Sequence, residues 1–308
     1  MSCKATARIP ASTTNLGPGF DVLGLALQLY STVTLKIIGE DTEVVVSGVD
    51  SEKIPSTPEH SGFKAVETIF QRSGIPQPKG MRLRIENGIP AIRGLGGSGT
   101  AILGGLLTAN ELCDAPFSLS DILNIAAEIE GHPDNVAASL YGGMVISVQD
   151  GNHIHTIKLD CDPDLHLVLA IPEFTLSTQE ARDILPDTVK FSDAIYNISR
   201  CSLLVASIAT GKLDMLSLSM KDVLHQPYRS NLIPGFDEVV HAASDAGALS
   251  TTLSGAGPTI AAFCLNNMET VGKQMKAAFM RHNIPCQIKV IRADQEGARV
   301  WTHDEENR

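Results

Sequence analysis

The sequence GLGGSGTAILGG at residues 94–105 holds Gly94, Gly96 and Gly99 at the spacing G-x-G-x-x-G. This spacing is typical of a dinucleotide-binding turn, although glycine-rich loops also bind the phosphates of ATP. Apolar residues then recur at three- and four-residue intervals over 102–107, which predicts that the loop leads directly into a helix. The chemistry of the chain therefore depends on which ligand this loop binds.

The residues around the loop argue against a dehydrogenase. A dinucleotide fingerprint needs a strand directly before its first glycine and an acidic residue about 20 residues further on. Here the predicted strand ends near Asn87, GIPAIR intervenes, and SLSDIL at 118–123 looks like a helix start. The G-x-x-x-x-G-K-[ST] phosphate loop is absent too.

A glycine-rich loop that enters a helix remains, and its backbone N–H groups and helix dipole favour phosphate. The hydroxyls of Ser98 and Thr100 could reach a metal on those phosphates. The alternative is a flexible turn, with Gly104 and Gly105 permitting close packing of the helix. The loop alone does not decide between these two interpretations.

The composition limits the classes of partner. Lys and Arg number 24 against 35 Asp and Glu, for a net charge of −11, which argues against binding to nucleic acid or anionic lipid. No apolar run reaches membrane-spanning length, and the first residues lack the apolar core of a signal peptide. Six scattered cysteines without C-x-x-C spacing indicate reduced thiols. We expect a cytoplasmic globular protein.

The hydrophobic periodicity predicts strands and helices mixed without a regular βαβ order, and so an α+β fold in two lobes. We expect an N-terminal lobe at 1–160 and a C-terminal lobe at 161–308, with the boundary within the polar stretch 150–165. The predicted strands are 5–9, 31–40, 42–49, 81–87, 144–149, 165–172, two within 248–265 joined at SGAGP, and 286–292. The predicted helices are 61–73, the one after the glycine loop, 119–130, 135–143, 188–210, 236–246 and 267–282.

Several motifs carry a specific family resemblance. PASTTNLGPGFDVLGLAL at 10–27 resembles the N-terminal signature of homoserine kinases, in the GHMP kinase superfamily. PAIRGLGGSGTA at 90–101 resembles the phosphate loop of that superfamily, and LSGAGPTIAAF at 253–263 resembles its third motif. EGHPDNVAASLYGG, STQEARDILP and YRSNLIPGF also fit homoserine kinases in order and spacing. The resemblance implies the two-lobed GHMP kinase fold, with mixed sheets packed against helices, an N-terminal ATP-binding lobe at 1–160, and the substrate site between it and the C-terminal lobe at 161–308.

Homoserine is a zwitterion with a terminal hydroxyl, so its site needs an anion for the ammonium and cations for the carboxylate. The resemblance implies that Asp21 binds the ammonium and that Asn15 orients the hydroxyl end. Arg182 and Arg229 are candidates for the carboxylate, since a guanidinium meets a carboxylate through paired hydrogen bonds. The remaining residues that the resemblance places in the site are His132, Asn135, Thr178 and Gly255.

The resemblance also implies ATP and Mg²⁺. Phosphoryl transfer relies on positioning and charge neutralisation, with Mg²⁺ on the outer phosphates. By resemblance, Ser98 and Glu130 would complete the magnesium shell, and the context EGH favours Glu130 over Glu128. The loop residues expected to bind the nucleotide are Pro90, Ala91, Ile92, Arg93, Gly94, Leu95, Gly96, Gly97, Ser98, Gly99 and Thr100.

Two features depart from the pattern of the superfamily. Several relatives place an aspartate as general base where this chain has Asn135, although the neighbouring Asp134 leaves the alignment arguable, and we name no base. The loop of the superfamily usually carries two serines followed by alanines, whereas this chain has Gly97, Ser98, Gly99 and Thr100, so that only Ser98 of the two serines is retained. Two added glycines raise the entropy cost of ordering the loop by about 0.5–1 kcal/mol each. We therefore expect weaker nucleotide binding or slower turnover.

The leading hypothesis is ATP-dependent phosphorylation of L-homoserine to O-phospho-L-homoserine, a step toward threonine. Two alternatives stay open: a GHMP kinase for another small alcohol, such as threonine or a mevalonate-like acid, and a ligand sensor of the same fold without catalysis. Homodimers are common in the family, but the sequence shows no apolar surface stripe that would establish one here.

Overall fold

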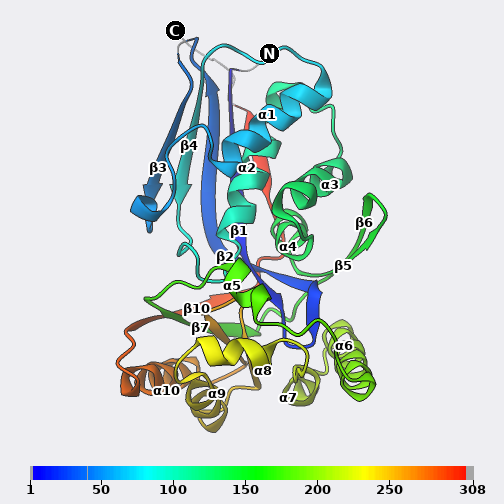
Figure 1. The fold of residues 1–308 in the computed structure, drawn as a ribbon, viewed down its shortest axis with the longest axis vertical. Coiled ribbons are helices and arrows are strands. Elements are labelled where there is room, and N and C mark those ends of the chain that lie inside the picture. The colour runs from blue at the N-terminus through cyan, green and yellow to red at the C-terminus, as the bar shows by residue number, and fades with distance from the viewer. Residues whose placement is uncertain (1–2, 40, 303–308) are drawn as a thin grey trace.

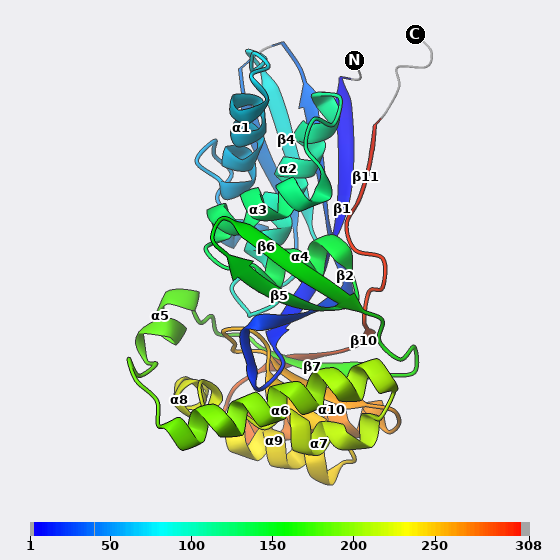
Figure 2. The same cartoon turned by 90° about the vertical axis from the view of Figure 1, so that its right-hand side faces the viewer.

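A computed structural model describes residues 3–39 and 41–302, and it has two β-sheets that are each covered by helices (Figures 1 and 2). The predicted α+β class is confirmed. The strands are β1 (Lys4–Asn15), β2 (Gly19–Ile37), β3 (Glu43–Gly48), β4 (Met81–Asn87), β5 (Met144–Asp150), β6 (His153–Leu159), β7 (His166–Pro172), β8 (Ser250–Leu253), β9 (Ile260–Cys264), β10 (Cys286–Arg292) and β11 (Arg299–Thr302). The α-helices are α1 (Ser61–Ser73), α2 (Gly97–Leu112), α3 (Leu119–Glu130), α4 (Asp134–Tyr141), α5 (Thr178–Asp183), α6 (Phe191–Thr210), α7 (Leu216–Ser219), α8 (Gln226–Arg229), α9 (Phe236–Asp245) and α10 (Met268–Arg281).

The larger sheet has the strand order β11-β1-β2-β4-β3. In addition, β5 pairs with the N-terminal part of β2, and β6 pairs with β5. β4 shows why one face is covered and the other is not: its residues alternate strictly between buried and exposed. The buried face packs against α1, α2, α3 and α4, and together they form one continuous apolar core. Strands from the two ends of the chain, β1 and β11, lie side by side in this sheet (Figure 2).

The smaller sheet is antiparallel, in the order β10-β7-β9-β8, and α9 and α10 cover one of its faces (Figure 1). Its other face meets the far ends of β1 and β2, with Leu25 and Leu27 packed in one cluster with Leu167 and Leu169. The pairing of β1 with β2 shifts register after Pro10, and beyond that point β1 is buried as far as Asn15. The two strands thus bring the turn between them, residues 15–19, to the junction of the two sheets.

Elements with a clear period were predicted to within a few residues, and those without one were missed. Ser118 caps α3 and forms a capping box with Asp121, and β10 has the predicted bounds. The polar stretch 150–165, expected to hold only the lobe boundary, contains β6, which pairs with β5 in the larger sheet. β11 was not predicted, and β2 begins at Gly19 rather than near residue 31. No helix of the described residues is long and apolar enough to cross a membrane.

Two glycines inside α2 explain how closely this helix packs. A Cβ on Gly104 would lie 2.3 Å from Val33 Cγ2 on β2, and a Cβ on Gly105 would lie 2.0 Å from the carbonyl oxygen of Gly62 on α1. Glycine in a helix costs stability relative to alanine, so these positions are retained for the close approach they allow. At Gly97, in contrast, the nearest atom to such a Cβ is 4.0 Å away.

We predict opposite effects of alanine at two glycines of α2. Gly105→Ala should lower the melting temperature, because the overlap with the α1 backbone costs about 1–3 kcal/mol. Gly97→Ala is the matched control, and it should raise the stability by about 0.4–1 kcal/mol because it only restricts the unfolded chain. Thermal unfolding followed by circular dichroism measures both variants. A Gly105→Ala protein as stable as the control would contradict this account of the packing.

Candidate active site

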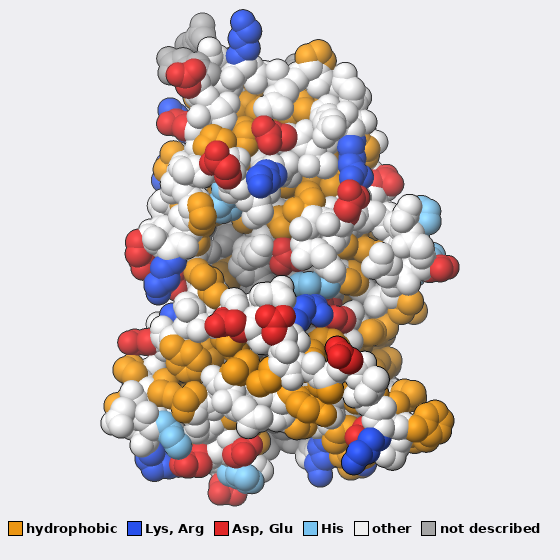
Figure 3. Space-filling view, in the orientation of Figure 1, with side chains coloured by type: hydrophobic (Ala, Val, Ile, Leu, Met, Phe, Trp, Pro, Cys, Tyr) orange, Lys and Arg blue, Asp and Glu red, His pale blue; other side chains and the backbone are white. Residues whose placement is uncertain are grey.

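A cavity of about 410 Å³ lies where the phosphate loop meets the turn between β1 and β2 and helices α5 and α8. Figure 3 shows the surface hollowed between the upper and lower parts of the molecule. The predicted site residues that line the cavity are Asn15, Asp21, Ala91, Ile92, Arg93, Gly94, Leu95, Gly96, Gly97, Ser98, Thr100, Glu130, His132, Asn135, Thr178, Arg182, Arg229 and Gly255. Pro90 and Gly99 are not among its lining residues.

The phosphate loop ends in a left-handed turn at Gly96, which precedes the first residue of α2. A Cβ on Gly96 would lie 2.2 Å from Ser12 Oγ, and one on Gly94 would lie 2.2 Å from the carbonyl oxygen of Ser254. Both glycines therefore allow a positive φ and a close approach. The N–H groups of residues 97–99 have no acceptor four residues back because they form the first turn of α2, so this end of the cavity can attract an anion.

Ser98 and Glu130 lie together at the same end of the cavity, although 32 positions separate them in the sequence. Ser98 Oγ donates to Glu130 Oε2 at 2.9 Å. Burial raises the pKa of Glu130, and the hydrogen bond from Ser98 acts in the opposite direction. A hydroxyl and a carboxylate are oxygen ligands of the kind that Mg²⁺ prefers, and Mg²⁺ usually takes only one or two carboxylates beside phosphates and water. No group of three or more His, Cys, Asp or Glu that could hold a metal occurs within the described ranges.

Arg93 and Thr100 turn their polar groups toward the protein rather than toward the loop's open side. Arg93 is 5% exposed, and its guanidinium donates to the carbonyl oxygens of Pro172, Glu173 and Ala91. Thr100 Oγ1 donates to the carbonyl oxygen of Gly97 at 2.8 Å. In this structure, Arg93 fastens the loop to the end of β7, and Thr100 stabilises the first turn of α2.

Asp21 and Arg182 form a bidentate ion pair at the opposite end of the cavity. The carboxylate oxygens of Asp21 each accept a bond from the Arg182 guanidinium at 2.9 Å. Asp21 has a φ of 57°, a strained conformation for a residue with a side chain. Arg182 lies on the short helix α5, which Ser177 and Glu180 begin with a capping box. The hydrogen bond to Asp21 raises the pKa of Arg182, so this guanidinium is charged at every physiological pH.

Arg229 is a buried cation that forms no ion pair with any carboxylate of the described residues. Its residue is 2% exposed, and the guanidinium donates to the carbonyl oxygens of Ala181 and Gly255 at 2.8 and 3.3 Å. Among the described residues, no carboxylate lies within ion-pair distance of it. Burial, and then the nearby charge of Arg182, lower its pKa to about 10. A buried charge of this kind is costly, and an anion bound in the cavity would reduce that cost.

Asn15 ties the turn between β1 and β2 to the loop after β8. Its Nδ2 donates to the carbonyl oxygen of Gly255 and its Oδ1 accepts from the N–H of Asp21, both at 3.0 Å. One amide hydrogen and one lone pair remain available to a ligand. Gly255 has a φ of 56°, and Thr178 is exposed at the start of α5.

His132, Asp134 and Asn135 form one hydrogen-bonded group at the start of α4. His132 Nδ1 lies 2.8 Å from Asp134 Oδ1, which also accepts the N–H of Asn135 at 2.8 Å. Burial lowers the pKa of His132, but the bond to Asp134 and the charges of Asp134 and Glu130 outweigh it, so the pKa is raised overall. Asn135 Oδ1 accepts from Ser12 Oγ at 2.9 Å. Asp134 is 2% exposed and lines the cavity, a position that the sequence shows only as a neighbour of two candidates.

No sequence motif points to the remaining wall of the cavity, which includes Lys53, Ile54, His60 and Asn87. His60 Nδ1 accepts the N–H of Gly62 at 2.9 Å and caps α1, and burial lowers its pKa. The Asn87 amide is used up by bonds to Ser31, Val49 and Ile89. These segments carry no motif, and only the packing of α1 and β4 brings them to the loop.

Comparison with known proteins identifies the family. The family model for the N-terminal domain of GHMP kinases matches residues 61–143, and the model for the C-terminal domain matches 204–281. A homoserine kinase of Moorella thermoacetica is 43% identical over 293 residues, which cover 95% of this chain and 98% of that protein. A homoserine kinase of Carboxydothermus hydrogenoformans is 41% identical over 94% of each chain.

The solved structures agree with the sequence comparison. The crystal structure of a homoserine kinase from Cytophaga hutchinsonii matches with a TM-score of 0.87 and 30% identity, over 98% of both chains. A mevalonate kinase structure matches with a TM-score of 0.67 at 15% identity, which shows a shared fold. Because the identity to homoserine kinases extends over nearly the whole chain and through both GHMP domains, this chain belongs to the homoserine kinase family of the GHMP kinases.

Proposed function

We propose that this chain phosphorylates the side-chain hydroxyl of L-homoserine with ATP and releases O-phospho-L-homoserine, a step toward threonine. The observation that carries the proposal is the arrangement of charge at the Asp21 end of the cavity. The Asp21 carboxylate and the guanidiniums of Arg182 and Arg229 lie there, and the glycine-rich loop with Ser98 and Glu130 lies at the other end.

The Asp21 end fits a zwitterion. In this structure Asp21 and Arg182 neutralise each other, whereas Arg229 has no carboxylate partner among the described residues. An α-amino acid would bring an ammonium for Asp21 and a carboxylate for Arg182 and Arg229. The bound amino acid would break the ion pair between Asp21 and Arg182, but it would give each of them a new partner of opposite charge. Its carboxylate would also supply the anion that Arg229 lacks. This end is completed by His132, Thr178 and the unused amide hydrogen and lone pair of Asn15. The backbone carbonyl of Gly255 accepts hydrogen bonds from both Asn15 and Arg229 and so fixes their side chains.

The other end fits the triphosphate of ATP. The first-turn N–H groups of α2 would bind phosphate oxygens, and Ser98 with Glu130 would hold Mg²⁺ through oxygen ligands. The metal, when bound, supplies charge neutralisation at the outer phosphates. The walls formed by residues 53–60 and 85–92 would enclose the nucleoside.

The reaction forms a bond from the substrate oxygen to the γ-phosphorus and breaks the bond to the leaving ADP, and the hydroxyl loses its proton. In a loose transition state, little proton removal is needed early, so alignment of the hydroxyl matters more than a strong base. Asn135 is an amide and cannot accept the proton. Its Oδ1 is held by Ser12, and the proposed task of Asn135 and Asn15 is to orient the hydroxyl.

The cytoplasmic location and the homodimer stay predictions. An exposed apolar row does occur on α6, where Phe191, Ile195 and Ile198 are 82%, 53% and 66% exposed. This exposed row was not predicted from the sequence.

Turnover with a panel of acceptors tests the proposal directly. With purified protein and Mg·ATP, we expect ADP release with homoserine and much less with threonine, serine or mevalonate, because mevalonate lacks an ammonium and because threonine and serine carry their hydroxyl on Cβ, one carbon closer to the ammonium and carboxylate. A coupled ADP assay measures this. Turnover only with another acceptor would replace the substrate, and ATP binding without any turnover would favour the ligand sensor.

Asp21→Asn should raise the KM for homoserine by about tenfold or more and leave the KM for ATP nearly unchanged. The substitution removes a charged partner of the ammonium, and a hydrogen bond to a charged group contributes about 1.5–3 kcal/mol. Asp183→Asn, on the exposed side of α5, is the control and should behave like the natural protein. An unchanged KM for homoserine in the Asp21 variant would exclude this role.

Ser98→Ala should raise the KM for Mg·ATP more than the KM for homoserine, because it removes one oxygen ligand and releases the Glu130 carboxylate. Titration of Mg²⁺ at fixed ATP should show a higher requirement for the metal. Ser199→Ala, an exposed serine on α6, serves as the control. Equal effects on both substrates would indicate a general folding defect rather than a metal site.

A further inference from the structure

Phe20 lies behind the Asp21 end of the cavity, and three groups contact its ring. The guanidinium carbons of Arg229 and Arg182 lie 4.9 and 5.6 Å from the ring centroid. The imidazole of His225 stacks on the ring at 5.2 Å between centroids, with 27° between the planes. Phe20 itself is not among the described residues that line the cavity.

The two guanidiniums oppose each other electrostatically. After burial, the charge of Arg182 is the largest cause of the lowered pKa of Arg229, and one carboxylate, Asp21, forms an ion pair with Arg182 alone. An aromatic ring carries negative charge density on its faces and attracts cations placed over them. Phe20 therefore attracts both guanidiniums without adding another carboxylate beside them. A carboxylate in its place would compete with the substrate carboxylate for the two guanidiniums.

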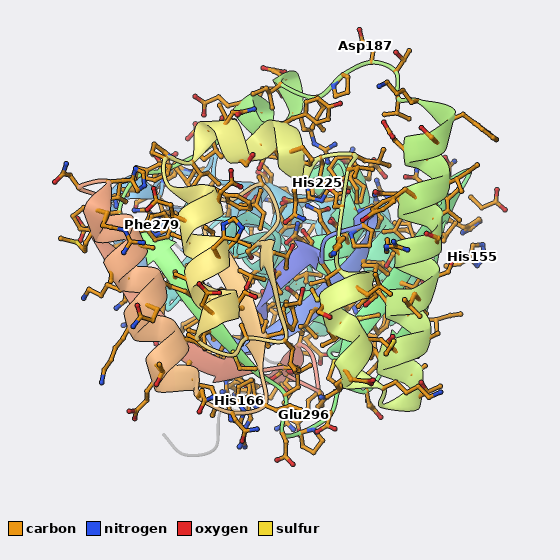
Figure 4. All side chains as sticks on the ribbon, turned by 90° about the horizontal axis from the view of Figure 1, so that it is seen from below. His155, His166, Asp187, His225, Phe279 and Glu296 are labelled. Atoms are coloured by element: carbon orange, nitrogen blue, oxygen red, sulfur yellow. The ribbon has the colours of Figure 1, made fainter. Side chains whose placement is uncertain are left out.

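His225 fixes the ring from behind without adding charge. It is fully buried, and its Nε2 donates to the carbonyl oxygen of Gly17 at 2.7 Å. Burial lowers its pKa in spite of the nearby Asp222, so the imidazole is neutral. Figure 4 shows His225 in the interior, among the helices of the lower part of the molecule.

Asp222 in turn fixes the segment that carries His225. Its carboxylate accepts the N–H groups of Leu224, His225 and Gln226 and the Nδ2 of Asn197. This carboxylate is therefore occupied by four donors, and its Oδ2 lies 3.6 Å from His225 Nε2. The ring of Phe20 thus contacts a fixed, neutral imidazole and the guanidiniums of Arg229 and Arg182.

We propose that Phe20 is a positioning residue that sets the affinity for the substrate carboxylate, through the attraction of its ring for the guanidiniums of Arg229 and Arg182. This inference rests on the proposed function, since it assigns those guanidiniums to the carboxylate. Phe20 does not touch the substrate. It holds both cations at one place, so that a single carboxylate can meet both of them.

The ring of Phe20 could act through its shape alone or through the negative charge on its faces. Fluorination distinguishes these two roles. Phenylalanines with one, two and three ring fluorines, introduced at position 20 in the full chain, keep the shape of the side chain and progressively weaken the negative charge on its faces. We expect the KM for homoserine to rise stepwise, by about tenfold at trifluorophenylalanine. The kcat and the KM for ATP should stay within about twofold.

The specificity for the carboxylate gives a second readout. Homoserinol carries a hydroxymethyl group in place of the carboxylate, so its kcat/KM should change little along the fluorine series, and the preference for homoserine should shrink. A structural defect would affect both acceptors equally. Trifluorophenylalanine at Phe279, a buried ring on α10 that is far from the cavity, is the control and should leave every parameter unchanged (Figure 4).

The outcomes separate this inference from the function on which it rests. If the natural protein does not phosphorylate homoserine, the proposed function fails and this inference fails with it. If the natural protein is active but the KM for homoserine stays flat along the series, or homoserinol is affected equally, only the role of Phe20 is overturned. Phe20→Leu, which removes the ring altogether, should reproduce the trifluoro result if it folds.

Discussion

The burial of the Arg229 guanidinium is the constraint on which the rest of the site depends. A cation that is 2% exposed and has no carboxylate partner within the described residues must find other compensation. Carbonyl oxygens from α5 and from the loop after β8 supply part of it, and the face of Phe20 supplies another part. Because these groups come from three distant segments, the charge can be accommodated only when the segments meet, and what remains uncompensated favours an anion in the cavity.

Hydrogen bonds between distant segments also connect the two sheets at the glycine-rich loop. Ser254 Oγ donates to the carbonyl oxygen of Gly94, and Arg93 donates to carbonyl oxygens at the end of β7. The loop that would bind phosphate is therefore fastened to the smaller sheet, while the helix that follows it packs in the core of the larger one. Left-handed backbone at Asn15, Leu16 and Asp21 is the strain that this junction tolerates, and two of these three residues line the cavity.

The parts that could be predicted from the sequence are those whose signal is local. The amphipathic spacing of residues 61–73 and the alternation in β4 come from burial on one side of an element, and both were predicted. β6 is mostly polar and β11 is four residues long, so only pairing with a neighbour makes them strands. In the site, motifs identified most of the cavity lining. They could not show that the Arg93 side chain turns to carbonyl oxygens, nor that Phe20 lies under two cations.

The glycine loop shows how one residue type serves two physical purposes. At Gly94 and Gly96 a side chain would meet neighbouring atoms at 2.2 Å, so packing and positive φ already require glycine there, whatever the ligand. At Gly99 a Cβ would lie 3.1 Å from Val136 Cγ1, which makes alanine a tight fit. Gly97 alone of the loop's four glycines has open space around its Cβ position. The departure from the pattern of the family at Gly97 therefore has no packing cause, and its effect falls on the ordering of the loop and on the phosphate contact that a serine hydroxyl would add there.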